Sequence, residues 1–125
     1  MQPGASQQPV VLIVDDEMLV RLCAIEAIES AGFEVIEAAD ADKAIAILEQ
    51  RSDIRLIFTD IHMPGSMDGI KLAHFVKGRW PPIKIIATSG DARITESDLP
   101  AGSRFLPKPY ATADIAGAIG QLIRQ

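Results

Sequence analysis

The chain has 125 residues and a formal net charge of −5. This length suits one domain with a sizeable core, and the acidic balance argues against direct binding to nucleic acid. No apolar stretch approaches the roughly 18 residues that cross a bilayer. The single cysteine, Cys23, excludes an internal disulfide and suits a reducing cytoplasm. Its apolar neighbours predict that it is a helical residue with a packed side chain and not a reactive thiol. Residues 1–9 are expected to form a flexible tail that precedes one domain over 10–125.

The first half of the chain predicts two strands and two helices. Residues 10–14 form a continuous apolar run that is typical of a buried parallel strand. The next segment is a helix closed by Gly32, and its apolar residues recur near a 3.6-residue period: Leu19, Leu22, Ile25 and Ile28. A second strand at 33–38 leads to a helix over 41–50 with Asp40 as its cap. Its expected inward residues are Ala44, Ile45 and Leu48.

The second half predicts three strands and two helices. The expected strands are 54–59, 83–88 and 104–106, the first of them buried in the middle of the sheet. A helix over 69–77 should bury Ile70, Ala73 and Val76. It ends at Trp80-Pro81-Pro82 because proline cannot continue a helix. The last helix covers 112–124 and is built on Ile115, Ile119, Leu122 and Ile123. Apolar runs that alternate with amphipathic segments indicate an α/β domain with a parallel sheet.

The segment between the fourth and fifth strands is too polar for a full helix. Residues 91–103 contain only Ile94 and Leu99 as large apolar residues, and Pro100 and Gly102 interrupt them. Two apolar residues make a poor helical face, so we expect one or two turns at most.

Polar side chains stand at the ends of four predicted strands. They are Asp15, Asp16, Asp60, Thr88, Ser89 and Lys108. The carboxyl ends of parallel strands line the crevice where open α/β sheets bind ligands, so these groups should meet there. Mg²⁺ takes oxygen ligands and keeps several waters, which leaves positions for phosphate oxygens. The pattern therefore predicts a site for Mg²⁺ and a phosphoryl group.

Four motifs contain these residues. They are LIVDDE (12–17), FTDIHMPGSMDG (58–69), IIATSG (85–90) and FLPKPY (105–110). With these four motifs in this order, the chain resembles the receiver domain of two-component response regulators. The resemblance implies a flavodoxin-like, doubly wound sheet of five strands in the order 2-1-3-4-5, which here would carry a short or irregular fourth helix.

The resemblance also implies a function. A histidine kinase or a histidine phosphotransfer protein would pass a phosphoryl group to this chain in a reaction that needs Mg²⁺ or Mn²⁺, and phosphorylation would switch binding to a downstream protein. Such a domain is a cytoplasmic phosphoacceptor that catalyses only its own phosphorylation and dephosphorylation. The family's common output face includes the fourth helix, so the weak segment at 91–103 predicts a different mode of partner binding.

Roles for individual residues follow from the same resemblance. Asp60 is the phosphoacceptor and a metal ligand, in keeping with the use of carboxylates as nucleophiles toward phosphorus. Asp16 binds the metal directly, Asp15 acts through a metal-bound water, and the backbone carbonyl of His62 completes the protein ligands. The His62 ring is expected to be exposed.

Three further residues complete the implied site. Lys108 pairs with the phosphoryl charge, and a cis bond to Pro109 aims its ammonium inward. Phe105 occupies the aromatic switch position, although a core role for this ring is also open.

The switch hydroxyl has two candidates. Strand alternation puts Thr88 and Ser89 on opposite sides, so only one of them can face Asp60. The resemblance places Ser89 in the functional position, followed by the small Gly90, and Thr88 is the alternative.

Two other functions remain open. A degenerate receiver would act as a binding module that does not depend on phosphorylation. A magnesium-dependent phosphatase with an aspartate nucleophile would need a second acid two residues after Asp60, where His62 stands.

Overall fold

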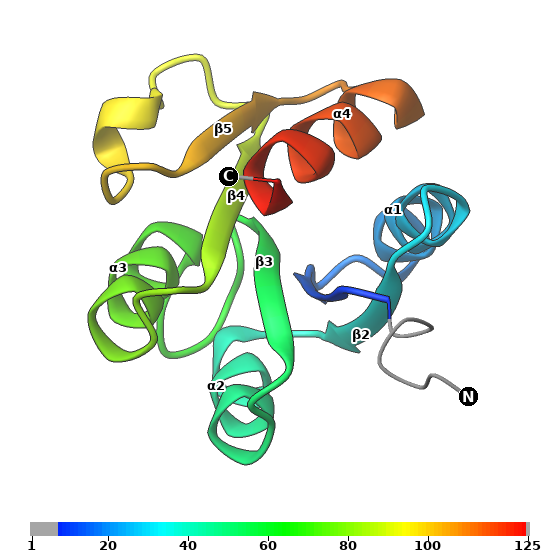
Figure 1. Ribbon diagram of the computed structural model, residues 1–125. Helices are drawn as coiled ribbons and strands as arrows, with labels where there is room; N and C mark the ends of the chain where they lie inside the picture. The colour runs from blue at the N-terminus through cyan, green and yellow to red at the C-terminus, as the bar shows by residue number, and fades with distance from the viewer. Residues whose placement is uncertain (1–7, 125) are drawn as a thin grey trace.

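A computed structural model describes residues 8–124, so most of the predicted tail lies outside the described residues. A five-stranded parallel sheet forms the centre of the domain (Figure 1). The elements are β1 (Val10–Val14), α1 (Met18–Ser30), β2 (Glu34–Ala38), α2 (Ala41–Gln50), β3 (Ile54–Asp60), α3 (Gly69–Arg79), β4 (Lys84–Ser89), the 3-10 helix η2 (Glu96–Asp98), β5 (Arg104–Pro107) and α4 (Thr112–Ile123). The strand order is β2-β1-β3-β4-β5, which confirms the prediction.

Helices cover both faces of the sheet. Helices α2 and α3 lie on one face, and α1 and α4 lie on the other (Figure 1). Alternate residues of β3 supply the two layers: Ile57 packs with α2 and α3, whereas Leu56 and Phe58 pack with α1 and α4. A strand that is buried on both faces reads as one apolar run, and this is why the strands could be located from the sequence.

Local caps fix where the helices begin and end. The Asp40 carboxylate accepts a hydrogen bond from the backbone N–H of Lys43, which confirms the predicted cap of α2. Asp68 caps α3 in the same way, through the N–H of Lys71. Gly32 follows α1 with φ of +97°, a conformation that glycine adopts without strain.

The predicted apolar stripe of α1 is confirmed only in its second half: Ile28 is buried and Ile25 packs against the core. The buried residues of this helix are Ala24, Ala27 and Ile28. Leu19 is 77% exposed and Leu22 is 48% exposed. Residues three apart advance about 300° around a helix, so the stripe drifts by about 60° at each step and Leu19 lies roughly opposite Ile28. Small alanines let α1 lie close to the sheet, and the larger apolar residues of its first turns are left in solvent.

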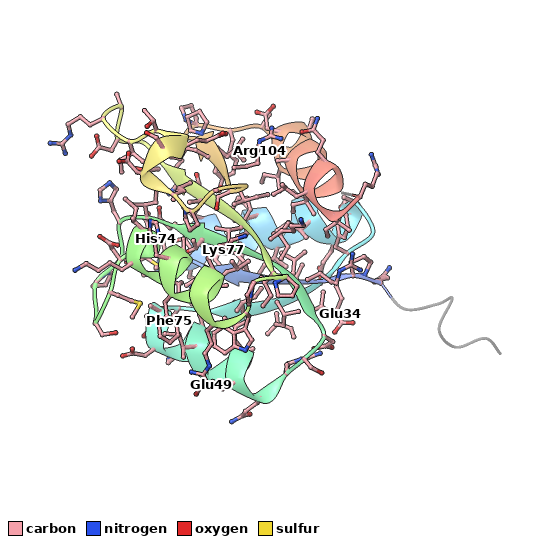
Figure 2. All side chains as sticks on the ribbon, turned by 60° about the vertical axis from the view of Figure 1, so that its left-hand side comes forward. Glu34, Glu49, His74, Phe75, Lys77 and Arg104 are labelled. Atoms are coloured by element: carbon pink, nitrogen blue, oxygen red, sulfur yellow. The ribbon has the colours of Figure 1, made fainter. Side chains whose placement is uncertain are left out.

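The segment after β4 contains one short 3-10 helix and no α-helix, as the sequence predicted. Leu99 is buried in the core beside α2 and α3, and Ile94 packs against the same core. The Nε2 atom of His74 on α3 lies 3.1 Å from the carbonyl oxygen of Asp98. Figure 2 shows α3 with His74, Phe75 and Lys77 labelled along it. Two apolar side chains and one ring contact thus attach this crossover to α3.

Candidate functional site

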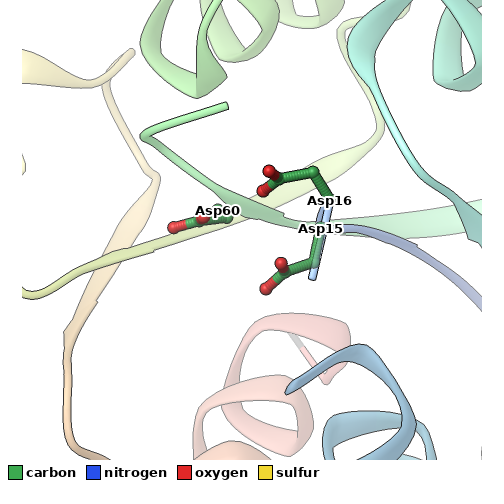
Figure 3. Close-up of side chains that lie close together, drawn as sticks. All are labelled: Asp15, Asp16 and Asp60. Atoms are coloured by element: carbon green, nitrogen blue, oxygen red, sulfur yellow. The ribbon is translucent and has the colours of Figure 1, made fainter. Parts of the chain in front are cut away.

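Three carboxylates meet where β1 and β3 end. Asp15 and Asp16 follow β1, Asp60 ends β3, and Val14 pairs with Thr59 in the sheet. One oxygen from each carboxylate lies within 4.8 Å of the others (Figure 3). Asp15 and Asp60 are buried, while Asp16 is exposed. The predicted convergence of the three acids is therefore present in the fold.

The environment of Asp15 disfavours its ionised form. Burial raises the pKa of this carboxyl above its usual value, and the charges of Asp60 and Asp16 raise it further. The backbone N–H of Glu17 and the charge of Lys108 act in the opposite direction. A divalent cation among the three carboxylates would relieve the repulsion, and oxygen donors of this kind suit Mg²⁺. The donor set fits Mg²⁺.

Lys108 supplies a positive charge to the same site. Its Nζ atom lies 3.3 Å from Oδ1 of Asp60, and both side chains are largely buried. The backbone N–H of Lys108 donates to the carbonyl oxygen of Ser89, which joins the ends of β4 and β5. The Lys108–Pro109 peptide bond is cis, as predicted.

Thr88 and Ser89 occupy different environments at the end of β4. Thr88 is in register with Asp60, and its Oγ1 atom is buried without a hydrogen-bond partner among the described residues. Ser89 is the last residue of the strand, and its Oγ accepts a hydrogen bond from the backbone N–H of Asp91. Of these two hydroxyls, only that of Ser89 forms a hydrogen bond with the loop that follows β4.

Two residues of that loop, Asp91 and Arg93, were not predicted from the sequence to belong to the site. The Asp91 carboxylate accepts hydrogen bonds from the backbone N–H and the guanidinium of Arg93. Its Oδ2 atom also lies 3.6 Å from Nε2 of His62, whose ring is exposed as predicted. The available signal was position, since Asp91 comes two residues after the end of β4 just as Asp16 comes two residues after the end of β1.

Two aromatic residues, Phe105 and Tyr110, lie in β5 and in the loop that follows it. Phe105 is half-buried against the α2 and α3 layer, and its N–H donates to a Glu96 carboxylate oxygen. Tyr110 packs edge-on against Phe58 with ring centroids 6.0 Å apart. Burial raises the pKa of Tyr110 to about 12, and the charges of Asp15 and Asp60 add to the effect.

An apolar pocket of about 610 Å³ lies between α1 and the loop that follows β5. Its lining includes Leu19, Cys23, Lys108 and Tyr110. Cys23 is exposed, so the prediction that its side chain is packed is wrong. The same orientation of α1 that exposes Leu19 brings Cys23 to the surface. The pocket reaches Lys108 and therefore adjoins the acidic site.

Gly69 allows α3 to begin directly against the end of β3. Its N–H donates to the carbonyl oxygen of Ile61 at 2.8 Å. A Cβ atom at this position would lie 2.1 Å from the carbonyl oxygen of Asp60 and 2.7 Å from Cα of Ile61. Glycine at position 69 is therefore a steric requirement of the site.

Comparisons with known proteins agree with this geometry. The model of the response regulator receiver domain matches residues 11–120. Sensor kinase CckA of Brucella abortus is 34% identical over 119 residues, which are 92% of this chain and 12% of the kinase. The response regulator receiver protein CpdR of the same organism is 31% identical, over 90% of this chain and 95% of CpdR.

Solved structures give the same result. The crystal structure of a response regulator receiver protein from Sinorhizobium medicae WSM419 has a TM-score of 0.87 and 29% identity, covering 94% of this chain and 95% of that chain. The family match spans the sheet and the residues that converge at its carboxyl edge. The chain therefore belongs to the response regulator receiver domain family.

Proposed function

We propose that this chain accepts a phosphoryl group on Asp60 from the phosphohistidine of a histidine kinase or a histidine phosphotransfer protein. The observation that carries the proposal is the meeting of Asp15, Asp16 and Asp60 with Lys108 at one edge of the sheet. Residues 10–125 constitute the receiver in this proposal. The phosphorylated form would differ from the free form in its affinity for a downstream protein.

The chemistry follows from the positions of these groups. An Asp60 oxygen attacks phosphorus in line, and the bond between phosphorus and the donor imidazole breaks. The Lys108 ammonium balances negative charge on the transferring oxygens. Mg²⁺ or Mn²⁺, held by Asp16, Asp60 and the carbonyl of His62, with Asp15 acting through a bound water, would supply further positive charge. Exposed apolar residues of α1 adjoin the site and offer a surface to the donor.

A small phosphodonor tests the proposal without a kinase. Acetyl phosphate and Mg²⁺ should raise the intact mass of the protein by one phosphoryl group, and a chelator should prevent the increase. The label should be lost at alkaline pH, as acyl phosphates are. A protein that acquires no label under these conditions would be a phosphorylation-independent binding module instead.

The phosphatase alternative has weaker support. The position two residues after Asp60 is His62, whose ring points to Asp91 and is exposed. No carboxylic acid stands there to protonate a leaving group. A test of hydrolysis with a general phosphatase substrate should therefore show no turnover.

Metal binding should stabilise the fold. A cation that binds the native state alone adds about 1.4 kcal/mol when it is present at ten times its dissociation constant. Mg²⁺ should therefore raise the melting temperature of the wild type, and Asp16→Asn should reduce that rise. Thermal melts at increasing Mg²⁺ concentrations measure the rise in melting temperature. The control is Glu26→Gln, which removes an exposed carboxylate elsewhere. An equal response in all three proteins would exclude Asp16 as a ligand.

The switch hydroxyl can be assigned with two variants. Ser89→Ala should still take up beryllofluoride, a phosphoryl mimic, but lose most of the change in backbone amide shifts that the mimic causes. Thr88→Val removes a buried hydroxyl without a partner and keeps its shape, so it should be neutral or should stabilise the fold by about 1 kcal/mol. The opposite pattern of amide shifts would assign the switch to Thr88.

A further inference from the structure

A connected set of contacts runs from an exposed arginine to the switch hydroxyl. The Nε and Nη2 atoms of Arg93 lie 3.0 and 2.8 Å from the two carboxylate oxygens of Asp91. The N–H of Arg93 donates to the same carboxylate at 2.9 Å. At the other end of Asp91, the backbone N–H donates to Oγ of Ser89 at 2.9 Å.

The direction of the last hydrogen bond matters for phosphoryl binding. A serine hydroxyl has one proton to donate and two lone pairs that accept. Because Oγ of Ser89 already accepts from Asp91, its proton is free to be donated to a phosphoryl oxygen. Movement of Asp91 would break the hydrogen bond that orients the Ser89 hydroxyl.

Asp91 also joins two loops of the site. Its Oδ2 atom lies 3.6 Å from the His62 ring, two residues after the phosphoacceptor, and its side chain is only 16% exposed. The Arg93 side chain is 89% exposed and contacts the site only through Asp91 among the described residues. The guanidinium also holds the pKa of the Asp91 carboxyl well below its usual range, so the carboxylate stays ionised.

We propose that Arg93 is a positioning residue for the phosphoryl site, acting through Asp91 to hold the Ser89 hydroxyl ready to donate to the phosphoryl oxygens. The inference rests on the proposed function, and it concerns how tightly Ser89 engages the phosphoryl group. Surface ion pairs contribute little to stability by themselves. Loss of Arg93 should therefore change binding at the site and leave the fold intact.

The chain contains a matched control pair. Arg51 and Asp53 have the same spacing, and Nε and Nη2 of Arg51 donate to the two oxygens of Asp53 in the same bidentate manner. This pair precedes β3, at the opposite end of the strand from Asp60. Arg51→Ala removes an equivalent exposed ion pair without touching the site.

The test is a double-mutant cycle on beryllofluoride affinity with Mg²⁺ present. Amide shifts followed during titration give the dissociation constant for the wild type, Arg93→Ala, Asp91→Ala, the double variant and Arg51→Ala. We expect each single substitution at Asp91 or Arg93 to weaken binding about fivefold, the size of one neutral hydrogen bond. The double variant should be no weaker than Asp91→Ala, and Arg51→Ala should match the wild type. Arg93→Lys should recover only part of the affinity, because lysine cannot form the bidentate contact.

Three outcomes would overturn this role for Arg93. The first is unchanged affinity in Arg93→Ala. The second is a double variant whose loss is the product of the two single losses, since Arg93 would then act through its own charge. The third is tighter binding in Asp91→Ala, which would make Asp91 a repulsive neighbour. A wild type that binds no beryllofluoride would instead refute the proposed function, so the two failures are distinguishable.

Discussion

Asp60→Asn is expected to abolish phosphorylation completely. The amide has the size of the carboxylate, but it has no anionic oxygen to attack phosphorus. Asp60 is buried, and its Oδ1 atom lies 3.3 Å from Nζ of Lys108. Intact mass after treatment with acetyl phosphate and Mg²⁺ should show a labelled wild type and an unlabelled variant.

Matched variants separate the nucleophile from the metal ligands. Asp16→Asn should slow labelling and raise the Mg²⁺ concentration that labelling needs, because it removes a ligand and leaves the nucleophile. Asp53→Asn, an exposed acid before β3, should be labelled like the wild type. Asp60→Asn must also keep its fold, which its amide spectrum would show. Equal labelling of Asp60→Asn and the wild type would place the phosphoryl group on another residue.

Gly69→Ala is expected to have the largest effect on stability. The new methyl group would clash with one peptide unit of the backbone: Asp60 O at 2.1 Å, Ile61 Cα at 2.7 Å and Asp60 C at 2.9 Å. Backbone cannot rotate away as a side chain can, so α3 must move off β3. Overpacking of this kind costs about 3 kcal/mol. The midpoint of urea unfolding should fall accordingly.

Gly78 provides the control within the same helix. It is exposed, and a Cβ atom there would have nothing within 4 Å. Gly78→Ala should raise stability by about 1 kcal/mol, because alanine has the higher helix propensity. If the two variants unfolded at the same urea concentration, the close approach at Gly69 would not limit the fold.

The sequence located the sheet and its polar edge because both depend on local chemistry. The apolar residues of β3 have to be buried, and Asp60 at the end of the strand then has to lie at the edge of the sheet. Which face of α1 is buried depends on tertiary packing and not on local sequence. Leu19, Leu22 and Ile28 belong to one three-residue spacing, which drifts around the helix, and only packing against the sheet selects Ile28 as a buried member.

The contacts of Asp91 could not have been predicted in the same way. An aspartate in a polar loop between two strands has many possible partners. Its contacts with Ser89, Arg93 and His62 depend on how the loop folds back after β4. Likewise, the polar composition of 91–103 predicted the lack of an α-helix, but not the contact between His74 and Asp98.

The strand order has a consequence for aggregation. It leaves β2 and β5 as the two edges of the sheet, and exposed edges can add strands from other molecules. Both edges are short, at 5 and 4 residues. Glu34 and Glu37 are exposed on β2, and Pro107 at the end of β5 has no N–H to donate. These features oppose edge-to-edge pairing, so concentrated protein should resist growth of intermolecular β-sheet.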